Sequence, residues 1–286
     1  MNLSIAHLGP TGTYAEAAAL AYANWLVREK GTESLLCPYP SIAQTLEATA
    51  QGLVNLAVVP VENSLEGSVT MTLDSLWRLD KLQIQQALVM PICHALLSYA
   101  ANLEEIRTVY SHPQALAQCQ GWLDKFLPSV QLVPMNSTTE ALKDLEWDRT
   151  AAAIASQRAA ELYNLPILAC PINDYLGNYT RFWVLSLQPS PGGTHTSLAF
   201  SVPANVPGAL AKPLDIFAKR NINLSRIESR PTKRSLGEYL FFIDLEADAN
   251  QPFVKAGLNE LITHTETLKI FGSYTVLPIE VEASSN

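Results

Sequence analysis

The feature that most constrains the fold is an alternation of short β-rich runs and helical runs from residue 1 to about residue 188. Strand patterns occur at LSIAHLG (3–9) and NLAVVPVE (55–62), and helical patterns at 13–30 and 41–52 lie between them. Strands that alternate with helices indicate mostly parallel sheets covered on both faces. The region is therefore predicted to be an α/β unit.

Two long segments indicate that this α/β unit is divided into two lobes. The run from Leu82 to Tyr99 is typical of a crossover to a second sheet, and LPILACPINDYLGNYTRFWVLSL (165–187) is typical of the return. A cleft between two α/β lobes is a common place for a small ligand.

The pattern changes after QPSPGGTHTS (188–197), whose prolines and glycines mark a linker. Beyond it the order is strand, helix, strand, strand, helix, strand, which is the ferredoxin-like βαββαβ unit with two helices on one face of an antiparallel sheet. We therefore predict a two-lobed domain at 1–188, a linker at 189–196 and a second domain at 197–286.

Composition and charge exclude several classes of function. The chain has 286 residues, 48% of them hydrophobic, so it can bury a large core. Its net charge of −8 argues against nucleic acid or an anionic membrane as a partner, because both require a basic face. The sequence contains no uninterrupted apolar run of about 18 residues, which a membrane span would need. The segment MNLSIAHLGPTG lacks the features of a secretory signal. A cytoplasmic protein with a small-molecule partner is expected.

The cysteines give no sign of a metal site or a disulfide framework. Cys37, Cys93, Cys119 and Cys170 lie far apart in apolar surroundings, without the paired spacing of zinc or redox motifs. Buried, reduced thiols and no bound metal are the expectation.

Four loops that follow strands share hydroxyl, amide or glycine groups just before a helix. They are GPTGTY (9–14), VENS (61–64), SHPQ (111–114) and NSTT (136–139). A helix N-terminus offers free N–H groups and the positive end of the dipole, so loops of this kind can hold carboxylates or phosphates. For any single loop, ordinary capping worth about 1 kcal/mol is the alternative. Four such loops around one cleft would hold a polyanion.

The segment GNYTRFWVL (177–185) opens a buried-looking strand with Thr180 and Arg181. Successive residues of a regular strand point to opposite faces, so both side chains line one site only if the backbone is irregular, which Gly177 would permit. Glu62 follows an apolar run, so its side chain is either buried at a strand end, which would raise its pKa, or a simple surface carboxylate. His112 is a candidate acid, base or positioning donor.

These segments together resemble the prephenate dehydratase family. GPTGTY, VPVENSLEGSV, SHPQALAQC, AAAIAS and NYTRF resemble its catalytic domain, and GAL with NLSRIESRP resembles the regulatory ACT domain at its C-terminus. The resemblance implies two α/β lobes of the type II periplasmic-binding-protein kind around a cleft. There prephenate loses carbon dioxide and its ring hydroxyl to give phenylpyruvate, a step of L-phenylalanine biosynthesis.

The resemblance also implies roles for single residues of a hydro-lyase that needs no cofactor. Thr180 would be the essential hydroxyl beside the leaving group, with Glu62 or His112 supplying the proton behind it. Arg181 would pair with a substrate carboxylate or brace the motif through an ion pair, and Phe182 would pack as core or contact the ring. The expected polar lining consists of Thr11, Gly12, Thr13, Asn63, Ser64, Ser111, Gln114, Ser137 and Thr138.

The ACT resemblance implies an amino-acid sensor, with L-phenylalanine as the expected effector. The site would lie between two copies, so a homodimer or homotetramer is expected. Gly208 would let a backbone N–H approach the ligand carboxylate. Pro213 lies inside the expected helix 208–221, which either begins near Lys212 or kinks. The expected effector residues are Asn205, where an aspartate is common in the family, Gly208, Ala209, Leu210, Glu228, Ser229, Arg230 and Pro231.

Three other functions stay open from sequence alone. A related dehydratase could prefer arogenate, which carries an amino group in place of the keto oxygen. The two-lobed fold is also shared with solute-binding proteins, so a binding protein is an alternative. The third is a regulatory ACT protein with an inert large domain.

Overall fold

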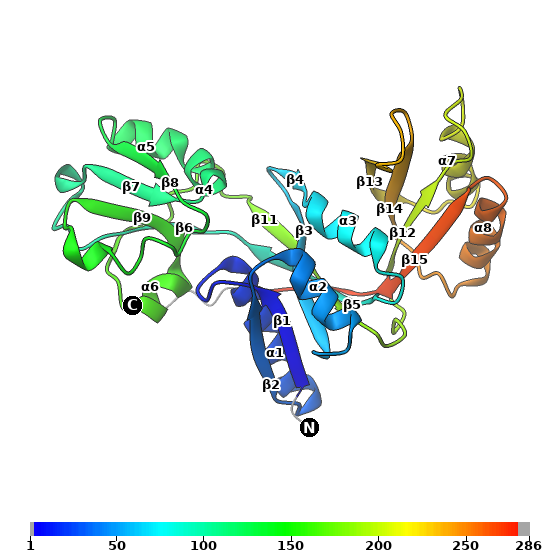
Figure 1. Ribbon diagram of the computed structural model, residues 1–286, viewed down its shortest axis with the longest axis horizontal. Coiled ribbons are helices and arrows are strands. Elements are labelled where there is room, and N and C mark those ends of the chain that lie inside the picture. The colour runs from blue at the N-terminus through cyan, green and yellow to red at the C-terminus, as the bar shows by residue number, and fades with distance from the viewer. Residues whose placement is uncertain (1–2, 280–286) are drawn as a thin grey trace.

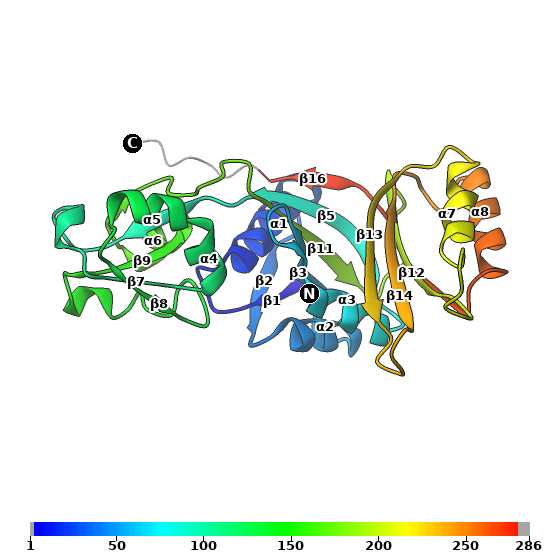
Figure 2. The ribbon, with the colours of Figure 1, turned by 90° about the horizontal axis from the view of Figure 1, so that it is seen from above.

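A computed structural model describes residues 3–279, which form three units, each built on its own sheet (Figure 1). Lobe 1 has a seven-stranded sheet, lobe 2 a five-stranded sheet and the C-terminal domain a four-stranded sheet. The two views show the units in a row with lobe 1 in the middle (Figures 1 and 2). The predicted fold, a two-lobed α/β unit followed by a ferredoxin-like domain, is confirmed.

Lobe 1 contains the N-terminal elements and two segments that return from elsewhere in the chain. They are β1 (Leu3–Leu8), α1 (Tyr14–Lys30), β2 (Ser34–Tyr39), α2 (Ile42–Ala50), β3 (Leu56–Asn63), β4 (Gly67–Ser68), α3 (Thr70–Arg78), β5 (Gln83–Pro91), β11 (Tyr179–Ser186) and β16 (Val276–Pro278). The strand order is β16-β5-β11-β3-β1-β2, with β4 paired to β3. Strand β11 runs antiparallel between β3 and β5, and Thr180, its second residue, follows directly on the segment that returns from lobe 2.

Lobe 2 is inserted between β5 and β11. Its elements are β6 (His94–Leu97), η1 (Leu103–Glu105), β7 (Thr108–Ser111), α4 (Pro113–Gln118), α5 (Gln120–Phe126), β8 (Gln131–Pro134), η2 (Leu145–Trp147), β9 (Ala151–Ser156), α6 (Gln157–Tyr163) and β10 (Ile167–Ala169). The strand order is β10-β6-β9-β7-β8, and β9 at its centre is buried along its whole length. The chain therefore crosses between the lobes twice, after β5 and before β11.

The C-terminal domain places two helices on one face of an antiparallel sheet. Its elements are β12 (His195–Ser201), α7 (Ala211–Ala218), β13 (Leu224–Pro231), β14 (Tyr239–Leu245), α8 (Pro252–Ile262) and β15 (Thr267–Tyr274). The strand order is β13-β14-β12-β15, with β13 at one edge. The other face packs on lobe 1, where Phe242, Phe271 and Tyr274 share one buried cluster with Trp183 and Leu73.

Several elements differ from the sequence-based expectation. Strand β2 was not anticipated, and residues 137–145, expected to be helical, are mainly turns. The last expected strand, 267–278, is divided, and its second part, β16, joins the sheet of lobe 1 beside β5 (Figure 2). Helix α7 begins at Ala211, so Pro213 lies in the first turn, where backbone N–H groups have no intrahelical partner.

The four thiols are free, although only Cys119 is buried and the other three are partly exposed. Within residues 3–279 no helix combines the length and the apolar character that a membrane crossing requires.

Candidate active site

A cleft of about 620 Å³ lies between lobes 1 and 2. Each of the four polar loops recognised in the sequence contributes to its wall, because the strands that precede them end at this side of the two sheets. The predicted residues that line the cleft are Thr13, Asn63, His112, Gln114, Ser137, Thr138, Thr180 and Phe182.

Ser64 and Ser111 hold the surrounding loops and do not line the cleft. Ser111 is buried, and its Oγ donates to the carbonyl of Ile154 (2.6 Å). Ser64 Oγ donates to the carbonyl of Gly177 (3.2 Å) and accepts from the backbone N–H of Tyr179 (2.9 Å). Ser64 thereby ties the end of β3 to the start of β11.

Arg181 and Glu62 lie on the opposite face of the sheet from Thr180. In the β11–β3 ladder Thr180 pairs with Asn63 and Arg181 with Glu62, so the pleat directs the two pairs to opposite sides. Arg181 Nη2 lies 3.5 Å from Glu62 Oε2, and Nη1 lies 3.1 Å from Asp244 Oδ2 in the C-terminal domain. The expectations that Arg181 meets a substrate carboxylate and that Glu62 supplies a proton are therefore wrong. The structure places Arg181 in an ion pair, the alternative role.

Thr180 has its side chain at the cleft and is 8% exposed. Asn63 Nδ2 donates to Thr180 Oγ1 over 3.0 Å. Because an amide nitrogen only donates, the hydrogen of the Thr180 hydroxyl must point elsewhere. Within residues 3–279 this hydroxyl has no other hydrogen-bond partner, so its hydrogen is available to a molecule in the cleft.

The orientation of the Asn63 side chain is fixed by the backbone. Its Oδ1 accepts from the N–H groups of Leu65 (3.0 Å) and Glu66 (3.1 Å), so Nδ2 must face the other way. There Nδ2 also donates to Asn178 Oδ1 (2.8 Å). Asn63 is 7% exposed and Asn178 is fully buried, so water does not compete for these bonds.

The polar chain continues from Asn178 across the lobe boundary. Asn178 Nδ2 donates to Gln118 Oε1 (2.8 Å), and His94 Nε2 lies 3.0 Å from the same oxygen. Since that oxygen only accepts, His94 must carry a hydrogen on Nε2. Its Nδ1, an acceptor in this tautomer, lies 3.0 Å from the hydroxyl of Tyr14, whose single hydrogen is shared between Nδ1 and the carbonyl of Cys93 (2.7 Å).

Burial sets the charge of the His94 and Tyr14 side chains. Burial lowers the pKa of His94, although the hydrogen bond to Gln118 acts to raise it. Burial also raises the pKa of Tyr14 well above its usual value. Both groups are therefore neutral at pH 7, and this end of the cleft carries no cation.

Sequence reasoning missed Tyr14, His94, Gln118 and Asn178 as parts of the site. Tyr14, Gln118 and Asn178 stand within GPTGTY, SHPQALAQC and NYTRF, but their motifs did not assign them a role, and His94 is a histidine within an apolar strand. The chain of contacts depends on bringing α1, β6, α4 and β11 together, which no sequence spacing encodes.

Neutral groups supply the donors of this cleft. Of the residues that the structure describes, those lining the cleft include no lysine or arginine. Helix α1, 17 residues long, points its N-terminus here, with Thr13 Oγ1 accepting from the N–H of Glu16 (3.4 Å). Glu140 is the one carboxylate of the described lining, and the N–H of Asn136 donates to it (2.7 Å). An anion bound here would be held by N–H and O–H donors.

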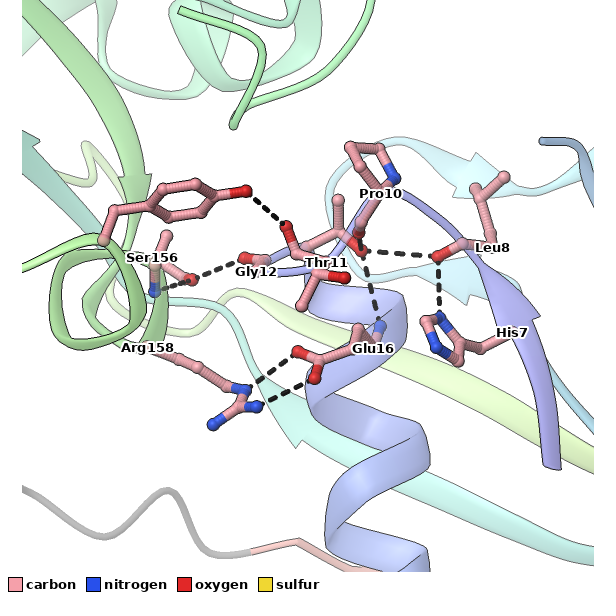
Figure 3. A network of polar contacts seen from close by, with 11 residues as sticks. His7, Leu8, Pro10, Thr11, Gly12, Glu16, Ser156 and Arg158 are labelled. Carbon is pink, nitrogen blue, oxygen red and sulfur yellow. Dashed lines mark hydrogen bonds and ion pairs between the residues drawn. The ribbon is translucent and has the colours of Figure 1, made fainter. Parts of the chain in front are cut away.

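Thr11 and Gly12 lie at a direct contact between the lobes (Figure 3). Ser156 Oγ donates to the carbonyl of Gly12 (3.1 Å), and the hydroxyl of Tyr163 donates to the carbonyl of Thr11 (3.4 Å). Gly12 has φ +87°, and a Cβ there would lie 3.2 Å from Cγ2 of Thr139, so a larger residue would push the lobes apart.

An ion pair closes the same contact. Arg158 of α6 donates from Nε and Nη2 to the two carboxylate oxygens of Glu16 in α1, both over 2.8 Å (Figure 3). Burial by itself would raise the pKa of Glu16, but the hydrogen bonds and charge of Arg158 outweigh it, so the pKa is lowered. Glu16 is therefore ionised at neutral pH.

Glu16→Gln is expected to raise KM for the substrate about 10-fold with little change in kcat. Losing a charged hydrogen bond costs about 1–2 kcal/mol, and that cost falls on the closed arrangement of the lobes. Steady-state kinetics would measure the change. Asp215→Asn, which removes an exposed ion pair with Lys219, is the matched control and should leave KM unchanged. A Glu16→Gln enzyme with the parental KM would show that the pair does not hold the lobes together.

Two family models match the chain, "Prephenate dehydratase" at residues 5–190 and "ACT domain" at residues 196–255. The chain belongs to the prephenate dehydratase family. Its predicted membership, and with it the hydro-lyase activity, is confirmed.

Other members of the prephenate dehydratase family match nearly the whole chain. It is 40% identical over 276 residues to a bifunctional chorismate mutase/prephenate dehydratase of Aquifex aeolicus, covering 96% of this chain and 74% of that protein. It is 37% identical over 282 residues to the prephenate dehydratase of Lactococcus lactis, covering 96% and 98%. The crystal structure of an Arthrobacter aurescens prephenate dehydratase in complex with L-Phe matches with a TM-score of 0.83 at 34% identity, over 96% of this chain and 90% of that one.

The predicted effector residues of the ACT domain come from two segments, the residues before α7 and the strand β13. Asn205 lines a hollow of about 290 Å³, where its Nδ2 donates to the carbonyl of Gly237 (2.9 Å). Gly208 has φ +83° in the turn before α7, and Ala209 and Leu210 complete that turn.

The remaining predicted effector residues lie along the edge strand β13. Arg230 donates from Nε and Nη2 to the carboxylate of Asp74 in α3 (3.0 and 3.1 Å), so it faces lobe 1, as does Glu228 two residues earlier. Ser229 and Pro231 are exposed. Strand β13 therefore directs Arg230 and Glu228 towards lobe 1 and leaves Ser229 and Pro231 open to solvent.

Proposed function

We propose that prephenate binds in the cleft between the two lobes, with its carboxylates held by neutral donors and its ring hydroxyl beside Thr180. The N-terminus of α1 and the hydroxyls of Ser137 and Thr138 are the donors. The observation that carries this proposal is the free hydrogen of Thr180 Oγ1, which Asn63 leaves directed away from itself.

The proposed chemistry needs one proton. The bond between the ring and its carboxylate breaks, carbon dioxide leaves, and the electron pair enters the ring as the C–O bond to the hydroxyl breaks. The departing hydroxide takes a proton and leaves as water, and the ring becomes aromatic. A hydrogen bond from Thr180 to the departing oxygen grows stronger as negative charge develops there, so it favours the transition state over the bound substrate.

His112 is proposed to donate a hydrogen bond from its ring in the cleft, while water supplies the proton that returns to Thr180, because a neutral imidazole that lost its one N–H proton would become an anion. His112 lines the cleft, and its Nδ1 accepts from the backbone N–H of Gln114 (3.2 Å), which leaves Nε2 as the protonated nitrogen of the neutral ring. Glu62, the other sequence-based candidate, lies on the far face of the sheet.

L-Phenylalanine is the proposed feedback inhibitor, bound between the ACT domains of two copies in a homodimer or larger even assembly. The described complex of the Arthrobacter protein with L-Phe supports the ligand. The edge strand β13, on which Ser229 and Pro231 are exposed and Ile227 is 47% exposed, supports a site that a second copy completes. The free thiols support the predicted cytoplasmic location.

The purified protein is expected to form phenylpyruvate from prephenate, and millimolar L-phenylalanine is expected to lower that rate several-fold. Ultraviolet absorbance of phenylpyruvate measures both. Arogenate assayed beside prephenate separates the two dehydratase specificities, because only the amino and keto groups differ. No phenylpyruvate from prephenate would refute the catalytic proposal, and an unchanged rate with L-phenylalanine would refute the regulatory one.

A further inference from the structure

The contact between the ACT domain and lobe 1 contains a buried carboxylate that receives bonds from both sides. Asp244 of β14 is 1% exposed. Its Oδ1 accepts from the hydroxyl of Ser197 (2.6 Å). Its Oδ2 accepts from Nη1 of Arg181 in lobe 1 (3.1 Å) and from Nη1 of Arg226 in the ACT domain (3.4 Å).

The two arginines come from the two strands on which function depends. Arg181 is the neighbour of Thr180 in β11, and Arg226 stands two residues before Glu228 in β13. One carboxylate oxygen therefore joins the strand that bears the cleft hydroxyl to the strand that carries half of the predicted effector residues.

The polar cluster is incompletely satisfied and lies within an apolar core. Arg226 Nη2 donates to the hydroxyl of Ser68 (3.2 Å), its guanidinium lies 5.9 Å from the ring centre of Trp183, and its Nε has no partner within the described residues. Trp183 belongs to the buried cluster shared by both domains. A buried cation of this kind depends on its counter-charge, so a change at Asp244 must be felt by both arginines.

We propose that Asp244 is a positioning residue for the reaction, which holds β11 and Thr180 in place through Arg181, and that effector binding on β13 reaches Thr180 through this carboxylate. The positioning part depends only on the contacts above. The regulatory part rests on the proposed L-phenylalanine site.

A second ion pair across the same domain contact provides a matched control. Lys269 of β15 binds the exposed Asp80 of lobe 1, which lies in the turn between α3 and β5 and is separate from the ion pairs of Arg181 and Arg226 with Asp244. Asp80→Asn removes a link between the domains without touching the Asp244 cluster. It should leave kcat, KM and the L-phenylalanine response of the parent unchanged.

Asp244→Asn in the full-length enzyme is expected to lower kcat about 10-fold and to leave KM within about twofold, because a small displacement of a reacting group reduces turnover more than binding. Hydrogen exchange of a peptide covering residues 177–186 should become faster. Parental kcat and exchange in a folded Asp244→Asn protein would overturn the positioning role. If the single variant does not fold, the double variant Asp244→Asn with Arg226→Gln also removes the buried positive charge of Arg226. Its kcat and the hydrogen exchange of residues 177–186 are then compared with those of the parent in the same way.

The regulatory part is tested by binding and inhibition measured separately. L-Phenylalanine is expected to bind Asp244→Asn with a calorimetric Kd within about threefold of the parent, while its maximal effect on kcat/KM falls below about twofold. An undiminished effect would overturn the proposed route. If the parent itself does not bind L-phenylalanine, the proposed regulatory function and this route both fail, and the positioning role still stands or falls on kcat and exchange.

Discussion

Asn63→Asp is expected to lower kcat about 10²–10³-fold without unfolding the protein, a loss in the range typical of a mispositioned proton donor. Aspartate keeps one oxygen for the N–H groups of Leu65 and Glu66. Its second oxygen replaces Nδ2, which now donates to Thr180 and also to the oxygens of Asn178 and Tyr179, so the variant loses some stability as well. A carboxylate oxygen accepts, so the Thr180 hydroxyl would donate to it and turn its hydrogen away from the substrate.

Turnover at saturating prephenate is the quantity to measure for Asn63→Asp, because the added negative charge also repels the substrate and raises KM. Circular dichroism checks the fold. Asn55→Asp is the matched control: Asn55 stands just before the same strand, and its side chain accepts from Ser4 at the far end of the lobe. That variant should keep kcat within about twofold. A kcat for Asn63→Asp equal to that of Asn55→Asp would show that Thr180 does not depend on Asn63 for its orientation.

The fold was largely predictable from sequence because buried strands appear as apolar runs between helical patterns. Strands β1 and β3 and helices α1 and α2 lie where their patterns predicted. Strand β2 was missed since it is an edge strand, half-buried and broken in pattern by Pro38. Strand β16 could not be foreseen, because it exists only through pairing with β5, nearly 190 residues earlier.

Part of the site was predictable for a related reason. A hydroxyl or amide residue just before a helix can be recognised from the neighbouring sequence alone. Thr13, Asn63, Ser137 and Thr138 were therefore predicted to line the cleft. The direction of Arg181 follows from strand alternation, but its partner Asp244 lies 63 residues away in another domain. The amide chain from Asn63 to His94 is likewise a product of packing between the lobes.

Thr180→Val is expected to give the largest loss, a fall in kcat of about 10²–10⁴-fold. Valine has the shape of threonine and suits a strand, but it has no hydrogen to donate. The cost to the fold is small, because Asn63 Nδ2 keeps the carbonyl oxygens of Asn178 and Tyr179 as acceptors (2.8 and 3.2 Å). Binding of prephenate should change little, since the donors proposed for its carboxylates are untouched.

Thr180→Ser is the matched control for the valine variant. Serine restores the hydroxyl at the same place, and Asn63 still directs its hydrogen into the cleft. Its smaller side chain leaves a methyl-sized gap, so a kcat within about 10-fold of the parent is expected.

Catalysis is proposed to depend on a hydroxyl hydrogen at position 180, directed by Asn63, that assists departure of the ring hydroxyl. The most direct test is the rate of phenylpyruvate formation at saturating prephenate, measured side by side for Thr180→Val and Thr180→Ser. We expect the serine enzyme to retain most turnover and the valine enzyme to lose at least about 100-fold. A valine enzyme that turns over as fast as the serine enzyme would contradict the claim.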